Sequence, residues 1–71
     1  MVKRTDLLRK IADAASAANI EFTLVREGGS HSIFQCGSQR VVVPRHREIN
    51  ELTTRGILRD LDDQLGKDWW K

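Results

Sequence analysis

Residues 20–43, IEFTLVREGGSHSIFQCGSQRVVV, decide the fold because they contain three strand-like runs rich in apolar residues, separated by two turns. The runs are Ile20–Arg26, His31–Cys36 and Arg40–Val43. Gly28-Gly29 separates the first run from the second, and Gly37-Ser38 separates the second from the third. Short runs with strand-like composition that are joined by glycine turns are typical of β-hairpins. The stretch therefore predicts a three-stranded antiparallel meander.

A helix is predicted before the meander. Between Thr5 and Ala18, apolar residues recur at helical spacing, which predicts an amphipathic helix with one buried stripe. Thr5 or Asp6 is the expected N-terminal cap, since both side chains can accept a backbone hydrogen bond. Asn19 is the expected end of this helix.

A second helix is predicted after the meander. Pro44 lacks a backbone donor and ends the third strand, and residues 45–51 are polar and expected to form the longest loop. Thr53 is the expected cap of a helix that continues to Gly66, with Leu52 packed against Ile57.

The order αβββα predicts an α+β fold in which a three-stranded antiparallel sheet carries two helices on one face. We expect that face to bury Phe22 and Leu24, and the opposite face to be left for solvent or a ligand. Residues 1–71 are expected to form one small domain, near the lower limit of size at which a single core is stable. Residues 67–71 are expected to be a C-terminal tail.

The composition is that of a globular protein, with 39% hydrophobic and 31% charged residues. No stretch approaches the roughly 18 consecutive apolar residues of a membrane span. The single cysteine, Cys36, has no partner for an internal disulfide, so we expect a cytoplasmic protein. The net charge is only +2, but between Arg26 and Arg47 four arginines and two histidines face one acid, Glu27. This basic segment favours a polyanionic partner.

Three short motifs follow one another in the chain. They are Gly29-Ser30-His31 before Ile33-Phe34, the strand end VVVPRH at residues 41–46, and the helix TRGILR at residues 54–59. In this order and spacing, they resemble the HicA family of bacterial toxins. The resemblance covers nearly all of the chain up to about Leu61.

The resemblance implies a fold like that of double-stranded-RNA-binding domains, used as an endoribonuclease that cleaves mRNA. It also implies a HicB-type antitoxin protein that holds the enzyme inactive. The catalytic histidine of the family's motif falls on His31. Many relatives have a second histidine where this chain has Ser32, so a mechanism with two adjacent histidines is not carried over.

The same residues suit RNA cleavage without a metal or a cofactor. An imidazole has an ordinary pKa of about 6.5, so much of it is neutral at cellular pH and can take the proton from a ribose 2′-hydroxyl. Arginines stay charged and bind phosphate oxygens through two donors. Gly28 and Gly29 tolerate positive φ and let a phosphate backbone approach His31. The expected RNA contacts are Gly29, Ser30, Arg45, His46 and Arg47, and we expect no metal site.

Plainer interpretations remain open at this point. Gly28-Gly29 can be an ordinary hairpin turn, and His31 can be an ordinary histidine at a strand edge. His46 can be a second acid, a phosphate contact or a solvated loop residue. The arginines can form a solvated surface. The chain can then be an RNA-binding module without catalysis, or a domain that binds only an acidic protein.

Two further expectations concern the cysteine and the tail. His31 and Cys36 are an odd number of positions apart on one strand, so they are expected on opposite faces, which excludes a shared zinc site or a Cys–His nucleophile. Cys36 is expected to be a buried small apolar residue. In the tail, either Trp69 or Trp70 packs back over the core, or one is an exposed anchor for the antitoxin.

Overall fold

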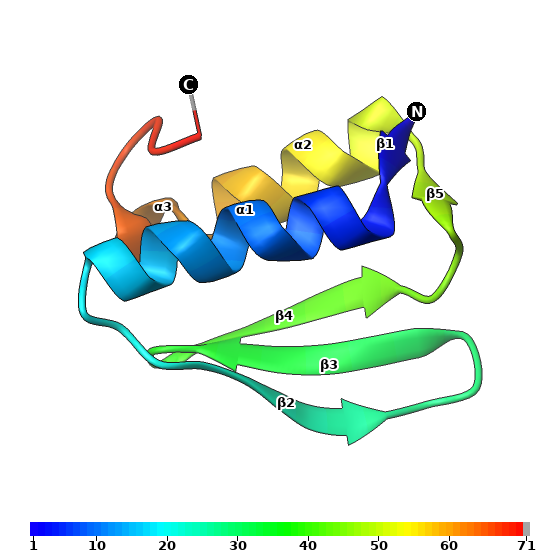
Figure 1. Ribbon diagram of the computed structural model, residues 1–71, viewed down its shortest axis with the longest axis horizontal. Helices are drawn as coiled ribbons and strands as arrows, with labels where there is room; N and C mark the ends of the chain where they lie inside the picture. Colours follow the sequence, from blue (N-terminus) through cyan, green and yellow to red (C-terminus); the bar gives the residue numbers. More distant parts are fainter. Residues whose placement is uncertain (71) are drawn as a thin grey trace.

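The computed structural model describes residues 1–70. Its elements are β1 (Val2–Lys3), α1 (Arg4–Ala17), β2 (Phe22–Glu27), β3 (His31–Cys36), β4 (Gln39–Pro44), β5 (Glu48–Ile49), α2 (Glu51–Asp60) and α3 (Asp62–Leu65). Figure 1 shows the helices on one side of the sheet formed by β2, β3 and β4. The predicted α+β fold with a three-stranded antiparallel sheet and helices on one face is confirmed. Within residues 1–70, no helix is long and apolar enough to cross a membrane.

The strand register decides which side chains face the helices. β3 is the central strand and pairs antiparallel with β2 and β4, and His31 lies opposite Pro44 while Ser32 lies opposite Val43. Because side chains alternate along a strand, Ser32 and Cys36 point toward the helices, where both are fully buried, and His31 points to the other face.

The core lies between the helices and the inner half of the sheet. Its residues are Leu7, Ile11, Ala15, Cys36, Val41, Val43, Ile49, Ile57, Leu58 and Leu61. Phe22 is half-buried and stacks on Phe34 with ring centroids 5.0 Å apart. The predicted burial of Leu24 is wrong, since this side chain is 50% exposed. Figure 1 shows the reason, because β2 is the outer strand and moves away from the helices along its length.

The N-terminus of α1 is set by a strand pair that the sequence pattern did not predict. β1 pairs antiparallel with β5, and the Arg4 N–H donates to the Arg47 carbonyl at 2.9 Å. The helix therefore begins at Arg4 after Lys3, which makes no side-chain capping bond, and the predicted caps Thr5 and Asp6 are wrong. The predicted end is confirmed, since α1 stops at Ala17 and Asn19 has a φ of 60°.

The start of α2 also differs from the prediction. The cap is Asn50, whose Oδ1 accepts a hydrogen bond from the Thr53 N–H at 2.7 Å, so Thr53 is inside the helix. The predicted packing of Leu52 is wrong as well, because this side chain is 83% exposed. Segment 45–51 is only partly a loop, since it contains β5 and the first residue of α2.

The C-terminal segment turns back onto the core. The single helix predicted to continue to Gly66 is divided in two: α2 ends at Asp60 and a short α3 ends at Leu65, after which Gly66 has a φ of 101° where the chain turns. Trp69 and Trp70 are half-buried against the core, and the Trp69 Nε1–H donates to the Leu58 carbonyl at 2.9 Å. The prediction that one tryptophan packs over the core is confirmed, and Lys71 of the predicted tail lies outside the described residues.

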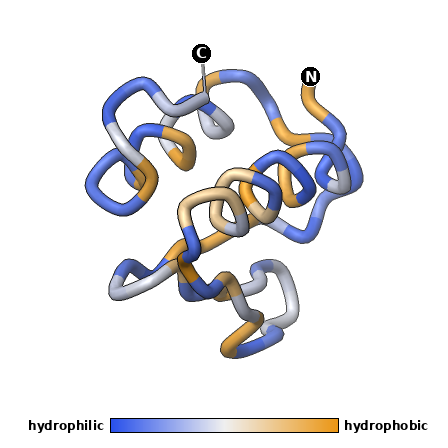
Figure 2. The backbone as a smooth tube through the Cα atoms, turned by 60° about the vertical axis from the view of Figure 1, so that its left-hand side comes forward, coloured by the Kyte–Doolittle hydropathy of each residue, from blue (hydrophilic) through white to orange (hydrophobic). Residues whose placement is uncertain are grey.

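Hydropathy along the chain agrees with this layering. Figure 2 shows polar and apolar stretches alternating along the chain, and an apolar stretch at the lower rim, at the height where β2 lies in Figure 1. Two exposed apolar residues of β2, Leu24 and Val25, are 50% and 44% exposed. The outer strand is thus the least covered part of the sheet.

Candidate active site

The two glycines of the β2–β3 hairpin have different roles. The Gly28 N–H donates to the His31 carbonyl at 2.8 Å, and a Cβ at Gly28 would lie 3.0 Å from that oxygen. A Cβ at Gly29 would meet no atom within 4 Å. Neither glycine has a positive φ, so the expected use of that conformation in this turn is wrong. A side chain at Gly28 would crowd the close turn, whereas the space around Gly29 is open.

His31 is the first residue of β3 and is exposed. Its Nδ1 lies 3.0 Å from the Ser30 Oγ, a distance that fits a hydrogen bond. This contact fixes the ring through Nδ1, and it leaves Nε2 for a ligand.

His31 lines two clefts. One has a volume of about 420 Å³ and also contains His46 and Glu48 among its lining residues. The other, of about 280 Å³, is lined by His31 together with Gly29, Ser30 and neighbouring residues of the open sheet face. The fold therefore brings His46, Gly29 and Ser30 around His31, as expected for residues of one site.

Arg45 joins the loop after β4 to the hairpin that carries His31. Its Nη1–H donates to the Gly28 carbonyl at 2.8 Å, its Nε lies 3.5 Å from the Glu27 carboxylate, and its N–H donates to the Ser30 carbonyl at 3.0 Å. The side chain is 44% exposed. Arg45 thus holds the hairpin in place, and its expected contact with RNA stays a prediction.

A polar network lies behind the hairpin, on the helix side of the sheet. The Ser32 hydroxyl donates to the Glu27 carboxylate and accepts from Arg4 Nη2 at 2.9 Å, and Arg4 Nε donates to the Pro44 carbonyl at 3.0 Å. Ser32 is 0% exposed, so position 32 does not face the clefts of His31. The second histidine near His31 in this chain is His46, from the loop after β4.

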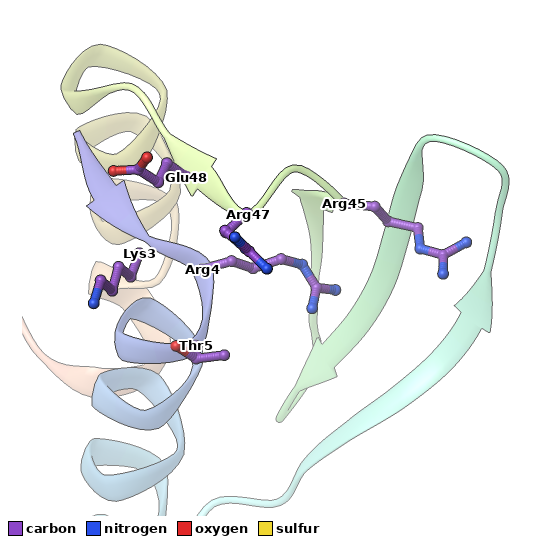
Figure 3. A pocket seen from close by; sticks show the side chains of 6 residues that line it. All are labelled: Lys3, Arg4, Thr5, Arg45, Arg47 and Glu48. Carbon is purple, nitrogen blue, oxygen red and sulfur yellow. The ribbon is translucent and has the colours of Figure 1, made fainter.

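A third and larger cleft, of about 660 Å³, lies beside this network and is strongly basic. Its lining residues are Lys3, Arg4, Thr5, Arg45, Arg47 and Glu48. Figure 3 shows Arg47 crossing close to Arg4 in the centre, Lys3 on the β1 side, and Arg45 pointing away toward the hairpin. Arg47 is therefore in this cleft and not in either cleft that contains His31.

Sequence reasoning missed several residues of these clefts, among them the charged residues Lys3, Arg4 and Glu48. Glu48 was assigned to a loop, and Lys3 and Arg4 lie more than 40 positions before the loop residues that line the same cleft. Their charges were visible in the sequence, but their position depends on the pairing of β1 with β5. Two paired residues in each strand are too few to give a periodic signal.

Cys36 is far from this chemistry. It is 0% exposed, points to the helix side of the sheet, and burial raises the pKa of its thiol. Both expectations for it, burial and a face opposite to His31, are confirmed. In the described part of the chain, no group of three or more His, Cys, Asp or Glu side chains could hold a metal ion.

Comparison with known proteins gives one match. The model of a family described as the HicA toxin of bacterial toxin-antitoxin matches residues 15–62, which include β2 to β5 and α2. No curated protein and no solved structure matches the chain.

Proposed function

The chain belongs to the HicA family of toxins of bacterial toxin-antitoxin systems, and from this membership we propose that it is an endoribonuclease that cleaves mRNA without a metal ion. His31 is its catalytic base. The observation that supports this most directly is the position of His31, which is exposed, hydrogen-bonded through Nδ1 and part of two clefts. One cleft holds a second histidine, and the other is lined by Gly29 and Ser30.

In the proposed reaction, His31 Nε2 takes the proton of a ribose 2′-hydroxyl. The 2′-oxygen then forms a bond to the adjacent phosphorus, and the bond from phosphorus to the 5′-oxygen of the next nucleotide breaks. Ser30 is a positioning residue: when Nδ1–H donates to its Oγ, the lone pair of Nε2 is free to accept the proton. The leaving oxygen needs a proton, and His46 in the same cleft is suited to supply it.

The proposed RNA contacts surround this base. Gly29 and Ser30 line one cleft of His31, and His46 lines the other. Arg45 and Arg47 add positive charge along the same loop, where guanidinium groups suit phosphate oxygens.

The proposed partner is a HicB-type antitoxin that covers this surface. A protein that covers Arg45, Arg47 and the clefts of His31 needs acidic residues there, because complementary charge speeds association and disfavours wrong partners. Mixing the two proteins is expected to stop RNA cleavage, and cleavage that continues unchanged in the complex would contradict this part of the proposal.

Cleavage of a long single-stranded RNA in excess EDTA tests the proposal. The parent protein is compared with His31→Ala and with the control Gln35→Ala, which changes the same strand and the same sheet face four positions away. Circular dichroism establishes that all three are folded. We expect the parent and Gln35→Ala to cleave and His31→Ala to lose at least about 100-fold in rate. Equal cleavage by His31→Ala would assign the chemistry to another residue.

The second candidate function is an RNA-binding module without catalysis, and the large basic cleft favours it. Such a protein binds RNA through phosphate contacts, with an affinity that falls steeply as salt rises. Tight, salt-sensitive binding without cleavage by the parent would support this candidate. Absence of RNA binding even at low salt would leave only an acidic protein as partner.

A further inference from the structure

Three clefts are linked by shared lining residues. His31 lines both the cleft of the open sheet face and the cleft of His46, and Glu48 lines both the cleft of His46 and the large basic cleft. We propose that the basic cleft between Lys3 and Arg47 is a second phosphate site, which binds the RNA backbone on one side of the linkage that is cleaved at His31. This inference rests on the proposed ribonuclease function.

The charges in the basic cleft have few protein partners. Among residues 1–70, the side chains of Lys3 and Arg47 take part in no hydrogen bond or ion pair, and Glu48 is the only acid among the residues that line the cleft. Cations that lie close together without acids repel one another, and an anion between them removes that repulsion. The cleft therefore suits a phosphate group.

Arg4 makes the cleft rigid. Its Nε and Nη2 are held by the Pro44 carbonyl and the Ser32 hydroxyl, at 3.0 and 2.9 Å. A guanidinium has five N–H donors, so Arg4 keeps donors for a ligand while its position is fixed. Arg47 lines the same cleft, and its backbone carbonyl accepts from the Arg4 N–H at 2.9 Å (Figure 3). Arg4 can therefore bind phosphate oxygens without first becoming ordered, and Arg47 adds a second guanidinium to the same cleft.

The first turn of α1 adds to the same field. Thr5 lines the cleft, and the 14-residue helix begins at Arg4 without a side-chain cap. The N-terminus of a helix carries a partial positive charge from its free N–H groups. The helix end thus reinforces the basic side chains.

One RNA strand can reach both sites. Pro44 pairs with His31, and Arg47 is three residues further along the chain, so the Cα atoms of Pro44 and Arg47 are at most about 11 Å apart. Continuity of the basic cleft with the cleft of His31 favours a phosphate of the substrate over an acidic segment of a protein. A substrate that extends past the cleaved linkage would then bind more tightly than a minimal one.

The test is RNA binding by the full chain, measured by fluorescence anisotropy over a range of salt concentrations, in a His31→Ala background that prevents cleavage. The test variant is Lys3→Ala with Arg47→Ala, and the matched control is Arg9→Ala with Lys10→Ala. Arg9 and Lys10 are exposed on α1 and do not line the basic cleft. The control therefore removes the same net charge as the test variant but leaves the cleft unchanged. Arg4 is left unchanged because it also holds the fold.

We expect the Lys3 and Arg47 variant to bind single-stranded RNA at least about tenfold more weakly than its parent. The slope of the logarithm of its binding constant against the logarithm of the salt concentration should be smaller in magnitude by about 0.7 for each phosphate that the variant no longer neutralises. The control is expected to keep nearly the parent's slope. An oligonucleotide too short to reach the basic cleft should bind the parent and the Lys3 and Arg47 variant alike.

Two results would overturn this inference and leave the proposed function standing. In the first, both double variants bind RNA equally well. In the second, RNA binding is unchanged, but binding of poly-glutamate needs Lys3 and Arg47. The second would assign the cleft to an acidic protein segment. If the protein with His31 intact neither binds nor cleaves RNA, the proposed function fails as well, and this readout separates the two failures.

Discussion

Neighbouring residues of β3 have opposite roles because strand side chains alternate between two faces. His31 is exposed in the clefts, whereas Ser32 is 0% exposed and joins Arg4 to Glu27. A histidine at position 32 would lie on the helix side of the sheet in this chain. At the scale of one residue, the strand face on which a side chain lies therefore decides whether it can take part in the proposed reaction or contributes to the stability of the fold.

This difference gives the first prediction. Ser32→Ala removes one hydrogen bond from each of the Arg4 and Glu27 side chains, and we expect it to lower the free energy of unfolding by about 1–3 kcal/mol, because hydrogen bonds to charged groups contribute more than neutral ones. Urea unfolding measures the change. Ser30→Ala is the matched control: Ser30 is exposed, so stability should change by less than about 0.5 kcal/mol while RNA cleavage falls.

The second prediction concerns the buried thiol. Burial raises the pKa of Cys36 above its ordinary value, so the native state holds the proton more tightly than the unfolded chain does. This contribution to stability is complete below about pH 9 and is lost as the pH rises from there toward the native pKa, by at most about 1.4 kcal/mol per pH unit.

Comparison of the parent with Cys36→Ala tests this. The variant lacks the thiol, so we expect the parent's advantage in free energy of unfolding to shrink between pH 8 and pH 10. Chemical denaturation at each pH measures both proteins, and other groups that titrate in this range cancel in the difference. A constant advantage would contradict the raised pKa.

At the scale of elements, helix ends were the least predictable feature. Sequence patterns placed the caps at Thr5 or Asp6 and at Thr53, but Lys3 and Asn50 precede the two helices. The two shifts have different causes. The Arg4 N–H at the start of α1 bonds to the Arg47 carbonyl beside the β1–β5 pair, whereas α2 begins after Asn50 because the Asn50 side chain itself caps the helix. The tryptophans of the tail likewise follow α3 back onto the core, where Trp69 bonds to the Leu58 carbonyl.

The third prediction concerns α2. Gly56 lies in the middle of this helix, is exposed, and a Cβ there would meet no atom within 4 Å. Gly56→Ala is therefore expected to stabilise the protein by about 0.5–1 kcal/mol, since alanine restricts the unfolded chain more than glycine does. The melting temperature should rise by about 2–8 °C. A lower melting temperature would show that the helix needs glycine here.

At the scale of the whole molecule, Arg4 connects parts of the chain that are far apart in sequence. It belongs to α1 and donates to the Pro44 carbonyl at the end of β4 and to Ser32 in β3, 40 and 28 positions away. It also lines the basic cleft. The same side chain thus ties the helix layer to the sheet and places positive charge near the site.

The fourth prediction follows from this connection. Arg4→Lys keeps the charge but replaces a planar group that donates in two directions by a single ammonium, so we expect it to keep one of the two bonds and to lose about 1–2 kcal/mol of stability. Urea unfolding measures the loss. Arg9→Lys, in the exposed part of the same helix, is the control and should change stability by less than about 0.5 kcal/mol.

Much of the fold and part of the site were predictable from the sequence. Local signals were sufficient for the meander, for two helices and for the burial of Cys36, because periodicity and turn residues act over a few positions. The exposure of Leu24 was not predictable, since it depends on how far the helices reach across the sheet. The face of the sheet on which His31 lies, opposite to that of Cys36, was predictable because side chains alternate between the two faces of a strand.

The sequence by itself thus determined the order of the two main helices and the three strands of the meander, the family and the identity of the candidate base, through motifs that are contiguous along the chain. Only the tertiary structure decided which residues surround that base. Lys3 and Glu48 reach the clefts because β1 pairs with β5, and His46 joins His31 because the loop after β4 passes the end of β3. Such contacts join distant segments through backbone pairing, which leaves no local pattern in the sequence.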